Sequence, residues 1–188
     1  MFLLSPARLS GRRGQILLNP SGKSALAQQL RTREGAAIGE VFAFVSALYF
    51  RGKLAYATAF AQPPAGARWL GNGVLVITQN RGLVPAESRV TVEHLALFME
   101  TNIKASEAAF VEPLRRDADK LARTLGTCGR AVLLGSIATP KYIEPLARSL
   151  GDHLCFPTRL RGLGDMSRGA LLLRCARERT ELEYEPVP

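Results

Sequence analysis

The sequence predicts an α/β fold: a single domain with a mixed central sheet, helices flanking it, and ligand loops at the strand ends. Short apolar runs at residues 2–4, 74–78 and 131–134 have the length and composition of inner strands. Segments with apolar residues three and four positions apart separate these runs, as helices do in α/β domains. The 188 residues, 47% of them hydrophobic, suffice for one core, and no repeat or linker divides residues 1–188.

The first strand should end at Ser5, because Pro6 has no amide hydrogen to donate to a sheet. A basic loop follows, in which Arg8 comes first and Arg12 and Arg13 come last. Two interpretations of this loop remain open. It is either a flexible surface arm or a loop that contacts an anion at the end of a strand.

The triplet Gly22-Lys23-Ser24 invites comparison with a phosphate-binding P-loop. That motif also needs a glycine at position 17, where this chain has leucine, so the sequence excludes it. Ser21 or Ser24 is better interpreted as the cap of a helix at residues 25–31. Residues 32–39 are polar, contain two glycines and are predicted as a loop.

Two apolar segments, residues 41–50 and 54–61, are predicted as buried helices that Arg51-Gly52-Lys53 interrupts. Neither is long enough to cross a bilayer. Residues 62–73 contain two prolines and three glycines and are predicted as a surface loop. The strand at 74–78 then leads into a polar exit that holds Asn80 and Arg81.

The second half continues the alternation of helices and strands. A short helix at 91–99 and an amphipathic helix from about Val111 to Leu125 precede the strand at 131–134. A further helix starts at Thr139-Pro140 and ends at Gly151, and a strand follows it. The remaining expectations are a basic loop at 161–169, a strand at 170–173, and an edge strand in the acidic tail that contains Leu182 and Tyr184.

Polar and charged side chains gather at the predicted strand ends. Ligands of open α/β sheets bind in crevices at the carboxyl ends of strands, and arginine matches two oxygens of a phosphate or carboxylate at once. The candidate ligand-binding residues are Ser5, Arg8, Asn80, Arg81, Ser136, Thr139, Lys141, Tyr142, Arg161, Asp165, Ser167 and Arg168. Asp165 is either a general base or ligand contact, or an orienting partner that pairs with Arg161 or Arg168.

The net charge of +9 favours a polyanionic partner, either nucleic acid or a nucleotide, although a solvated arginine-rich surface gives the same balance. Cys128, Cys155 and Cys175 form no CxxC pair, so the sequence predicts no zinc or iron–sulfur site and favours a reducing, cytoplasmic location. We find no cofactor motif and no Ser-His-Asp or Cys-His arrangement. The apolar start is too short for a signal peptide or membrane span, so we expect no membrane partner.

Several segments resemble, in order, the bacterial peroxide stress resistance YaaA family. RGLGDMSR resembles the family's arginine-glycine, methionine, serine-arginine signature, and GSIATPKY resembles its strand-end segment. LLSPAR resembles the opening SPAK, with Arg8 where lysine is usual, and AFVSALYFRGKLA and RGLVP match more loosely. The family usually carries a helix-hairpin-helix unit near residues 32–39, and this chain is too short there to hold it. This departure weakens the expectation of duplex DNA binding that the resemblance carries, and the preference for single or double strands stays open.

The resemblance implies a cytoplasmic stress-response protein that protects against peroxide damage, in connection with limiting free intracellular iron, and that binds DNA. The residues themselves leave a second possibility open. A strand-end pocket with Ser136, Asp165 and arginines suits an enzyme that acts on a nucleotide or nucleobase, for example a glycosylase or transferase. A plain interaction protein is the third alternative.

Overall fold

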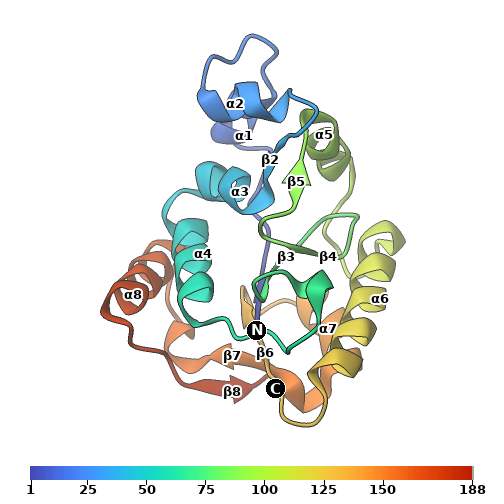
Figure 1. Cartoon of the computed structure of the whole chain (residues 1–188), viewed down its shortest axis with the longest axis vertical. Coiled ribbons are helices and arrows are strands. Elements are labelled where there is room, and N and C mark those ends of the chain that lie inside the picture. The colour runs from blue at the N-terminus through green and yellow to red at the C-terminus, as the bar shows by residue number, and fades with distance from the viewer. Residues whose placement is uncertain (188) are drawn as a thin grey trace.

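The computed structural model describes residues 1–187 and is built around a six-stranded mixed sheet (Figure 1). Its order is β4-β3-β1-β6-β7-β8. The four inner strands are parallel to one another: β3 (Val74–Ile77), β1 (Phe2–Leu4), β6 (Ala131–Leu134) and β7 (Leu154–Pro157). The edge strands β4 (Leu83–Pro85) and β8 (Tyr184–Pro186) run antiparallel to their neighbours. The predicted mixed sheet, with an edge strand in the tail, is therefore confirmed.

Helices cover both faces of the sheet. Because successive strand residues point to opposite faces, Phe2 and Leu4 belong to one core and Leu3 belongs to the other. The first core lies under α4 (Leu48–Phe60) and α8 (Asp165–Glu178), and the second under α6 (Ala108–Leu125) and α7 (Pro140–Leu150). The two pairs of helices stand on opposite sides of the sheet in Figure 1. The flanking helices of the prediction are thus present.

The strand order places a topological switch point between β1 and β6. From β1 the chain moves to β3 on one side, whereas from β6 it moves to β7 on the other side. The helix α4 lies on one face of the sheet and α7 on the opposite face, and ligands of open α/β sheets bind near the carboxyl ends of the strands at such a switch point. Ser5 and Gly135 directly follow β1 and β6.

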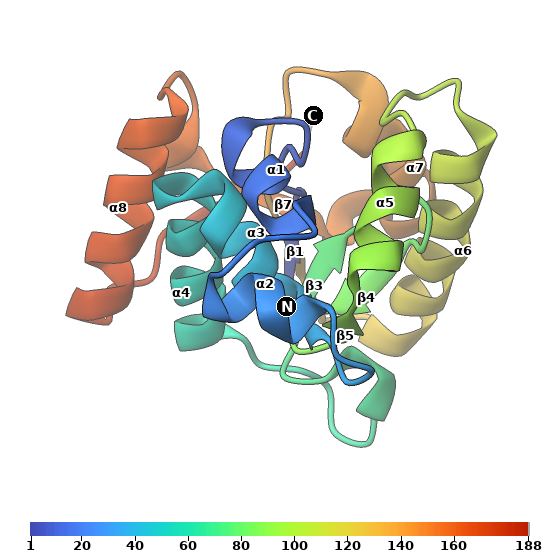
Figure 2. The same cartoon turned by 90° about the horizontal axis from the view of Figure 1, so that it is seen from above.

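A smaller layer lies over the carboxyl end of the sheet, which Figure 2 views from above. It contains four helices and a two-stranded ribbon: α1 (Arg12–Leu18), α2 (Ala25–Leu30), α3 (Ile38–Ser46), α5 (Val92–Glu100), β2 (Ala36–Ala37) and β5 (Arg89–Val90). Ser24 caps α2 through a 3.2 Å bond from the Ala27 amide, as expected. Three single-turn 3₁₀ helices complete the chain: Arg68–Leu70, Gly151–His153 and Thr158–Leu160.

The predicted strand at 170–173 is wrong, because these residues belong to α8. The basic loop is correspondingly shorter, since the helix already begins at Asp165. Leu171, Leu172 and Cys175 are buried on one side of the helix, at helical spacing. A short apolar run does not by itself distinguish a strand from a buried helix, and here packing against α4 decided the outcome.

The helices α4 and α8 cross with their backbones in contact. A Cβ atom on Gly52 would lie 2.6 Å from the Gly169 carbonyl oxygen, and one on Gly169 would lie 2.8 Å from the Leu48 carbonyl oxygen. Both positions therefore need glycine. The crossing brings the first turn of α8 beside the first turns of α4.

Two smaller differences concern the first half of the chain. The basic loop after β1 turns into α1 at Arg12, so its last residues are helical. The break in the apolar helical segment lies at Ala47, with φ 51°, and residues 51–53 continue inside α4 instead of interrupting it. Gly52 is tolerated inside the helix because the crossing with α8 occupies the space of its missing side chain.

Candidate functional site

A cavity of about 430 Å³ lies at the carboxyl ends of β1 and β3. We call it the strand-end pocket. Its walls come from the loop after β1, the exit of β3, the end of α5 and the first turn of α7. The charged, amide, aromatic and thioether side chains that line it are those of Arg8, Gln79, Phe98, Met99, Lys141 and Tyr142.

The pocket combines positive charge with apolar surface. Arg8 is exposed, and its Nε atom donates a 3.0 Å hydrogen bond to Ser10 Oγ. Lys141 Nζ lies 5.0 Å from the centre of the Tyr142 ring. Burial raises the pKa of Tyr142 to about 12, so its hydroxyl stays neutral at physiological pH. The pocket therefore offers two cations beside an aromatic wall.

Gln79 adds a polar group to this lining. Its side chain is 5% exposed, and within residues 1–187 its Oε1 atom has no hydrogen-bond partner. A buried amide oxygen without a partner is unfavourable by about 1–3 kcal/mol. A ligand that rotates or engages this amide would relieve that penalty.

A second group of polar residues surrounds the exit of β1. We call Ser5, Tyr49, Lys53, Asp165 and Arg168 the β1-exit cluster. Lys53 is 2% exposed, and its Nζ atom donates hydrogen bonds to the Ser5 carbonyl oxygen at 2.6 Å and to Ser5 Oγ at 2.9 Å. Ser5 Oγ can in turn donate to the Leu134 carbonyl oxygen of β6, 3.4 Å away.

The environment of Lys53 disfavours its charged form. Burial lowers the pKa of Lys53 to about 7, while Asp165 acts to raise it and Arg168 to lower it further. The Nζ atom lies 4.6 Å from the centre of the Tyr49 ring and 4.8 Å from that of Phe50. In the described part of the chain Lys53 forms no salt bridge, since the one found there joins Arg116 to Asp117.

Tyr49 completes the cluster from the first turn of α4. Burial raises the pKa of Tyr49, and the nearby Arg168 guanidinium partly offsets this effect. The Tyr49 hydroxyl is buried and has no hydrogen-bond partner among residues 1–187. The cluster thus places a buried amine over the ring of Tyr49, whose hydroxyl has a raised pKa.

The structure divides the twelve predicted residues among several places. Arg8, Lys141 and Tyr142 line the strand-end pocket. Ser5, Asp165 and Arg168 belong to the β1-exit cluster, although Asp165 itself is exposed. The other six lie elsewhere: Asn80, Arg81, Ser136, Thr139, Arg161 and Ser167.

Those six residues have local surroundings of their own. Ser136 Oγ accepts a 3.3 Å bond from the Ala138 amide, and Thr139 is exposed at the start of α7 without a side-chain capping bond. The Arg161 guanidinium lies 5.0 Å from the centre of the Phe156 ring. Ser167 is exposed and faces a separate hollow with Arg159 and Arg174.

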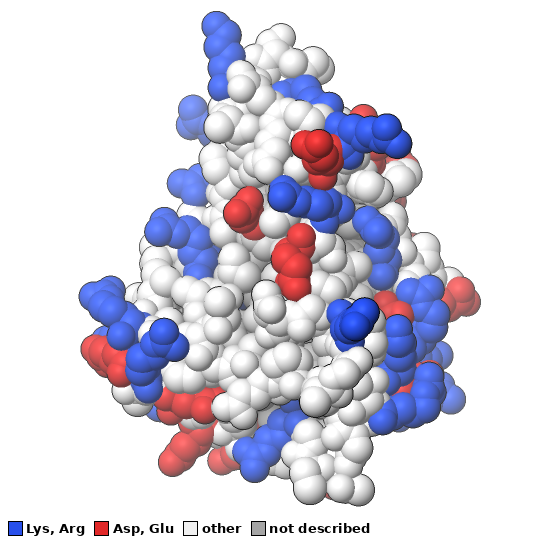
Figure 3. Space-filling model, in the orientation of Figure 1, with Lys and Arg blue, Asp and Glu red and all other residues white. Residues whose placement is uncertain are grey.

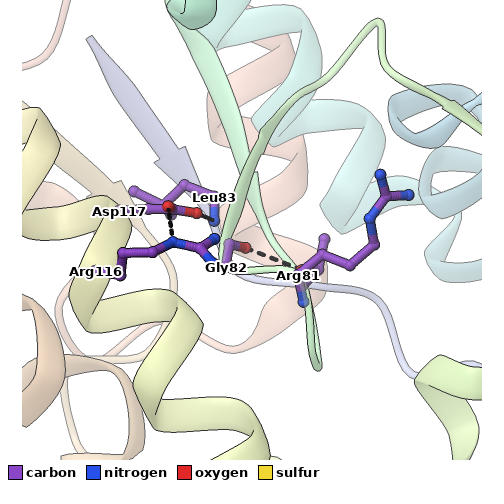
Figure 4. A network of polar contacts seen from close by, with 6 residues as sticks. Arg81, Gly82, Leu83, Arg116 and Asp117 are labelled. Carbon is purple, nitrogen blue, oxygen red and sulfur yellow. Dashed lines mark hydrogen bonds and ion pairs between the residues drawn. The ribbon is translucent and has the colours of Figure 1, made fainter.

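Asn80 and Arg81 directly follow each other in the turn at the exit of β3, and Figure 4 shows Arg81 and the contacts of the turn with α6. Asn80 Nδ2 donates to the Leu97 carbonyl oxygen at 3.1 Å, which ties the turn to α5. Asp117 of α6 accepts the Leu83 amide at 2.9 Å and Arg116 Nε at 2.9 Å. The Arg81 side chain points away from this network in Figure 4, and it does not line the strand-end pocket.

The expected pairing of Asp165 with Arg161 or Arg168 is wrong. In the described residues neither arginine forms an ion pair with Asp165. Arg168 Nε instead donates a 3.0 Å hydrogen bond to the Leu160 carbonyl oxygen. Because Asp165 opens α8, it lies where a helix favours negative charge, and it needs no arginine partner there.

Positive charge does not gather in one basic cleft on the face shown in Figure 3. Lysine and arginine side chains lie mainly along the outline of this face, with acidic side chains among them. Such a distribution is typical of a solvated surface, so the net charge of +9 does not by itself mark a binding site there.

Reasoning from the sequence missed Lys53, Gln79 and Phe98, and it favoured a place in the core for Tyr49. A signal for Lys53 was present: it lies four residues after Tyr49 and three before Tyr56, on the same side of a helix as these aromatic residues. A lysine within an apolar stripe is a candidate for a buried amine. Gln79 carried no comparable signal, because its burial depends on α5 and α7.

No family model, curated protein or solved structure that was compared with this chain matches it. Within the described residues no group of three or more histidine, cysteine, aspartate or glutamate side chains is placed to hold a metal ion. None of the helices there has the length and apolar character needed to cross a membrane.

Proposed function

We propose that the protein binds a nucleotide, or one nucleotide unit of a nucleic acid, in the strand-end pocket. The observation that carries this proposal is the composition of the pocket at the switch-point end of the sheet. Arg8 and Lys141 supply positive charge for phosphate, and the largely buried side chains of Phe98, Tyr142 and Gln79 form the wall against which a base would lie. The volume of about 430 Å³ lies within the usual range for small-molecule sites.

The resemblance to the YaaA family supports a cytoplasmic role in peroxide stress, with DNA as a ligand, as part of the same proposal. The size of the pocket favours a single nucleotide, a strand end or an unpaired base over a continuous duplex.

Calorimetric titration with the ribo- and deoxyribonucleoside monophosphates and with short single-stranded and duplex DNA tests this proposal. Lys141→Ala should weaken nucleotide binding about tenfold, which corresponds to about 1.4 kcal/mol. Arg174→Ala is the matched control, since Arg174 is exposed on α8 and lies outside the strand-end pocket. Its affinity should equal that of the wild type.

Salt dependence gives an independent check on the partner. If a single strand binds, log K should fall against log salt with a slope of about −0.7 for each contacted phosphate, against about −0.9 on duplex. Absence of binding by every nucleotide and oligonucleotide at low salt would remove the proposal. Equal losses in Lys141→Ala and Arg174→Ala would place the ligand outside the pocket.

A second candidate function is an enzyme that acts on the bound nucleotide. The observation that favours it is the hydrogen bond between the buried Lys53 amine and the Ser5 hydroxyl, at the strand end that leads into the pocket. The contacts of Lys53 and Ser5 are considered separately below.

A further inference from the structure

Lys53 is buried with an unusual set of partners. Buried charges in proteins are normally paired with an opposite charge, because removing an isolated ion from water is strongly unfavourable. Lys53 has no carboxylate at salt-bridge distance in residues 1–187, and its hydrogen bonds go to the carbonyl and hydroxyl oxygens of Ser5. A lysine in these surroundings is held in or near its neutral form, in which the nitrogen has a free lone pair.

The Ser5 hydroxyl has two acceptors within reach. It can donate to the Leu134 carbonyl oxygen at 3.4 Å, or to Lys53 Nζ at 2.9 Å once that nitrogen has lost its proton. The second bond is the shorter one. When a hydroxyl donates a hydrogen bond to a neutral amine, the amine can act as a base and remove the hydroxyl proton, which makes the oxygen a nucleophile.

Ser5 directly follows β1 at the switch point, and its side chain is 7% exposed. The next residues, Pro6 and Ala7, line the strand-end pocket. Close to Ser5 is Gly135, where a Cβ atom would lie 2.9 Å from Ser5 Cβ and 3.0 Å from Ser5 Oγ. Ser5 therefore packs so closely against Gly135 that a side chain at position 135 would displace the Ser5 side chain.

Gly135 also lines the second cavity, together with Arg161 and Arg168. This cavity is small, about 10 Å³, which is close to the room that one water molecule or one ligand oxygen needs. Guanidinium groups match phosphate oxygens in geometry and charge. Ser5 is therefore next in sequence to residues that line the strand-end pocket, and it packs against Gly135, which lines a small cavity bordered by two arginines and by apolar side chains.

Backbone strain at the start of α4 supports a functional role for this end of the helix. Ala47 has φ 51° and ψ −117°, and only one other non-glycine residue in the described chain, Arg179, has a positive φ. Such strain persists where the surrounding structure imposes it, and it is common at functional sites. Here it directly precedes the helical turn that carries Tyr49 toward Lys53.

We propose that Ser5 and Lys53 form a catalytic nucleophile and general-base pair that cleaves a phosphoester of the bound nucleotide. The choice of substrate rests on the nucleotide-binding function proposed above, whereas the pair itself rests on its own contacts. The small cavity with Arg161 and Arg168 fits a phosphoryl oxygen better than an uncharged acyl group.

The reaction is balanced without a further reagent apart from water. Ser5 Oγ forms a bond to phosphorus, the bond from phosphorus to the leaving oxygen breaks, and the hydroxyl proton moves to Lys53 Nζ. The Lys53 ammonium then gives this proton to the leaving oxygen. Water attacks the phosphoserine, Lys53 takes a proton from that water, and the Ser5 oxygen leaves and is reprotonated.

The charged and titratable groups around Lys53 are compatible with this role. Asp165 and Arg168 act on it from α8 in opposite directions, and Tyr49 faces it from its own helix as a neutral hydroxyl. Burial, the largest influence, lowers the pKa of Lys53 to about 7, so a substantial fraction of the amine is a free base at neutral pH.

Labelling with a fluorophosphonate tests the pair directly, because an activated serine displaces fluoride and keeps the phosphonyl group. Intact mass and peptide mapping should place the label on Ser5, and Ser5→Ala should not be labelled there. Lys53→Met should reduce the labelling rate by about 10²–10⁴-fold. Ser21→Ala and Lys23→Met are the matched controls, since both residues are exposed on the loop before α2, and their rates should equal the wild-type rate.

The pH profile separates a catalytic from a structural lysine. The wild-type labelling rate should rise as pH passes through about 7, since only the deprotonated amine acts as a base. Lys53→Met should lack this rise. If Lys53→Met does not fold, the pH dependence of labelling in the wild type and the loss of label in Ser5→Ala still test the proposed pair. No label on Ser5, or a rate that does not change between pH 6 and pH 8, overturns the proposal.

Release of 4-nitrophenolate from a nucleoside 5′-(4-nitrophenyl phosphate) tests the choice of substrate. Turnover should be lost in Ser5→Ala and weakened through KM in Lys141→Ala. Nucleotide binding without labelling of Ser5 would leave the proposed function in place and defeat the catalytic pair. Labelling of Ser5 without binding or turnover of any nucleotide would keep the pair and defeat the phosphoester assignment together with the proposed function.

Discussion

The exits of β1 and β3 are both short polar segments that follow apolar strands. In the structure their polar groups find hydrogen-bond partners of different kinds. At the exit of β3, Thr78 Oγ1 donates to the Gly82 carbonyl oxygen at 3.0 Å and accepts the Arg81 amide at 2.9 Å. Asp117 then accepts the Leu83 amide, so the turn is satisfied by its own backbone and by one carboxylate from α6 (Figure 4). At the exit of β1, the partner is a lysine from α4 that has no opposite charge to pair with.

The difference lies in where the polar partners come from. A strand-end turn whose side chains bond to neighbouring amides and carbonyls is complete without a ligand, and its residues stabilise the fold. At the other kind of strand end, a distant helix contributes a buried amine that has no opposite charge beside it. Burying such an amine lowers the stability of the fold, and groups of this kind are common at functional sites. The comparison therefore marks the exit of β1 as the place to look for catalytic chemistry, whereas the exit of β3 contributes Gln79 to the lining of the strand-end pocket.

The largest effect is expected from Lys53→Met, measured by chemical denaturation as a function of pH. The pKa of Lys53 is about 7 in the folded protein against its ordinary 10.5, so between these values the unfolded chain holds a proton that the folded chain lacks. Wild-type stability relative to Lys53→Met should then rise by about 4–5 kcal/mol from pH 7 to pH 10.5 and stay flat below pH 7. A difference that is independent of pH would show that Lys53 carries its proton in the folded protein.

A middle-sized effect is expected from Asp117→Ala at the exit of β3. Removing the carboxylate leaves the Leu83 amide without its acceptor, so the free energy of unfolding should fall by about 1–3 kcal/mol. Nucleotide affinity should remain that of the wild type, since Asp117 does not line the strand-end pocket. Glu112→Ala, an exposed change on the same helix, is the control for stability. A loss of affinity without a loss of stability would contradict the structural role given to this turn.

The smallest effect is expected from Arg168→Ala in the β1-exit cluster. Arg168 donates one hydrogen bond to the Leu160 carbonyl oxygen and forms no ion pair with Asp165. Thermal denaturation should therefore report a loss of about 1 kcal/mol, the value of a single hydrogen bond, and not the 3–5 kcal/mol that follows from breaking a buried ion pair. Asp165→Ala is the matched test, and equally large losses in both variants would restore the pairing.

Much of the fold follows from local patterns in the sequence. The apolar runs that became β1, β3 and β6, and the spacings that became α6 and α7, were sufficient to predict these elements and the layered arrangement. Residues 170–173 show where this reasoning fails, because four apolar residues satisfy a strand and a buried helix equally well. The close contact of Gly169 with Leu48 and Tyr49 favours the helical conformation of these residues over a strand.

The sequence by itself determined which residues end strands and carry charge, and so it predicted Ser5, Arg8, Lys141 and Arg168 as site residues. Only the tertiary structure decided which of these side chains are already satisfied, and it brought Lys53 to Ser5 across 48 positions of the chain. The physical reason is that periodicity reports whether a residue faces a core but not which atoms it meets there. The crossing of α4 and α8, which set the surroundings of Lys53, depends on two glycines that are 117 positions apart.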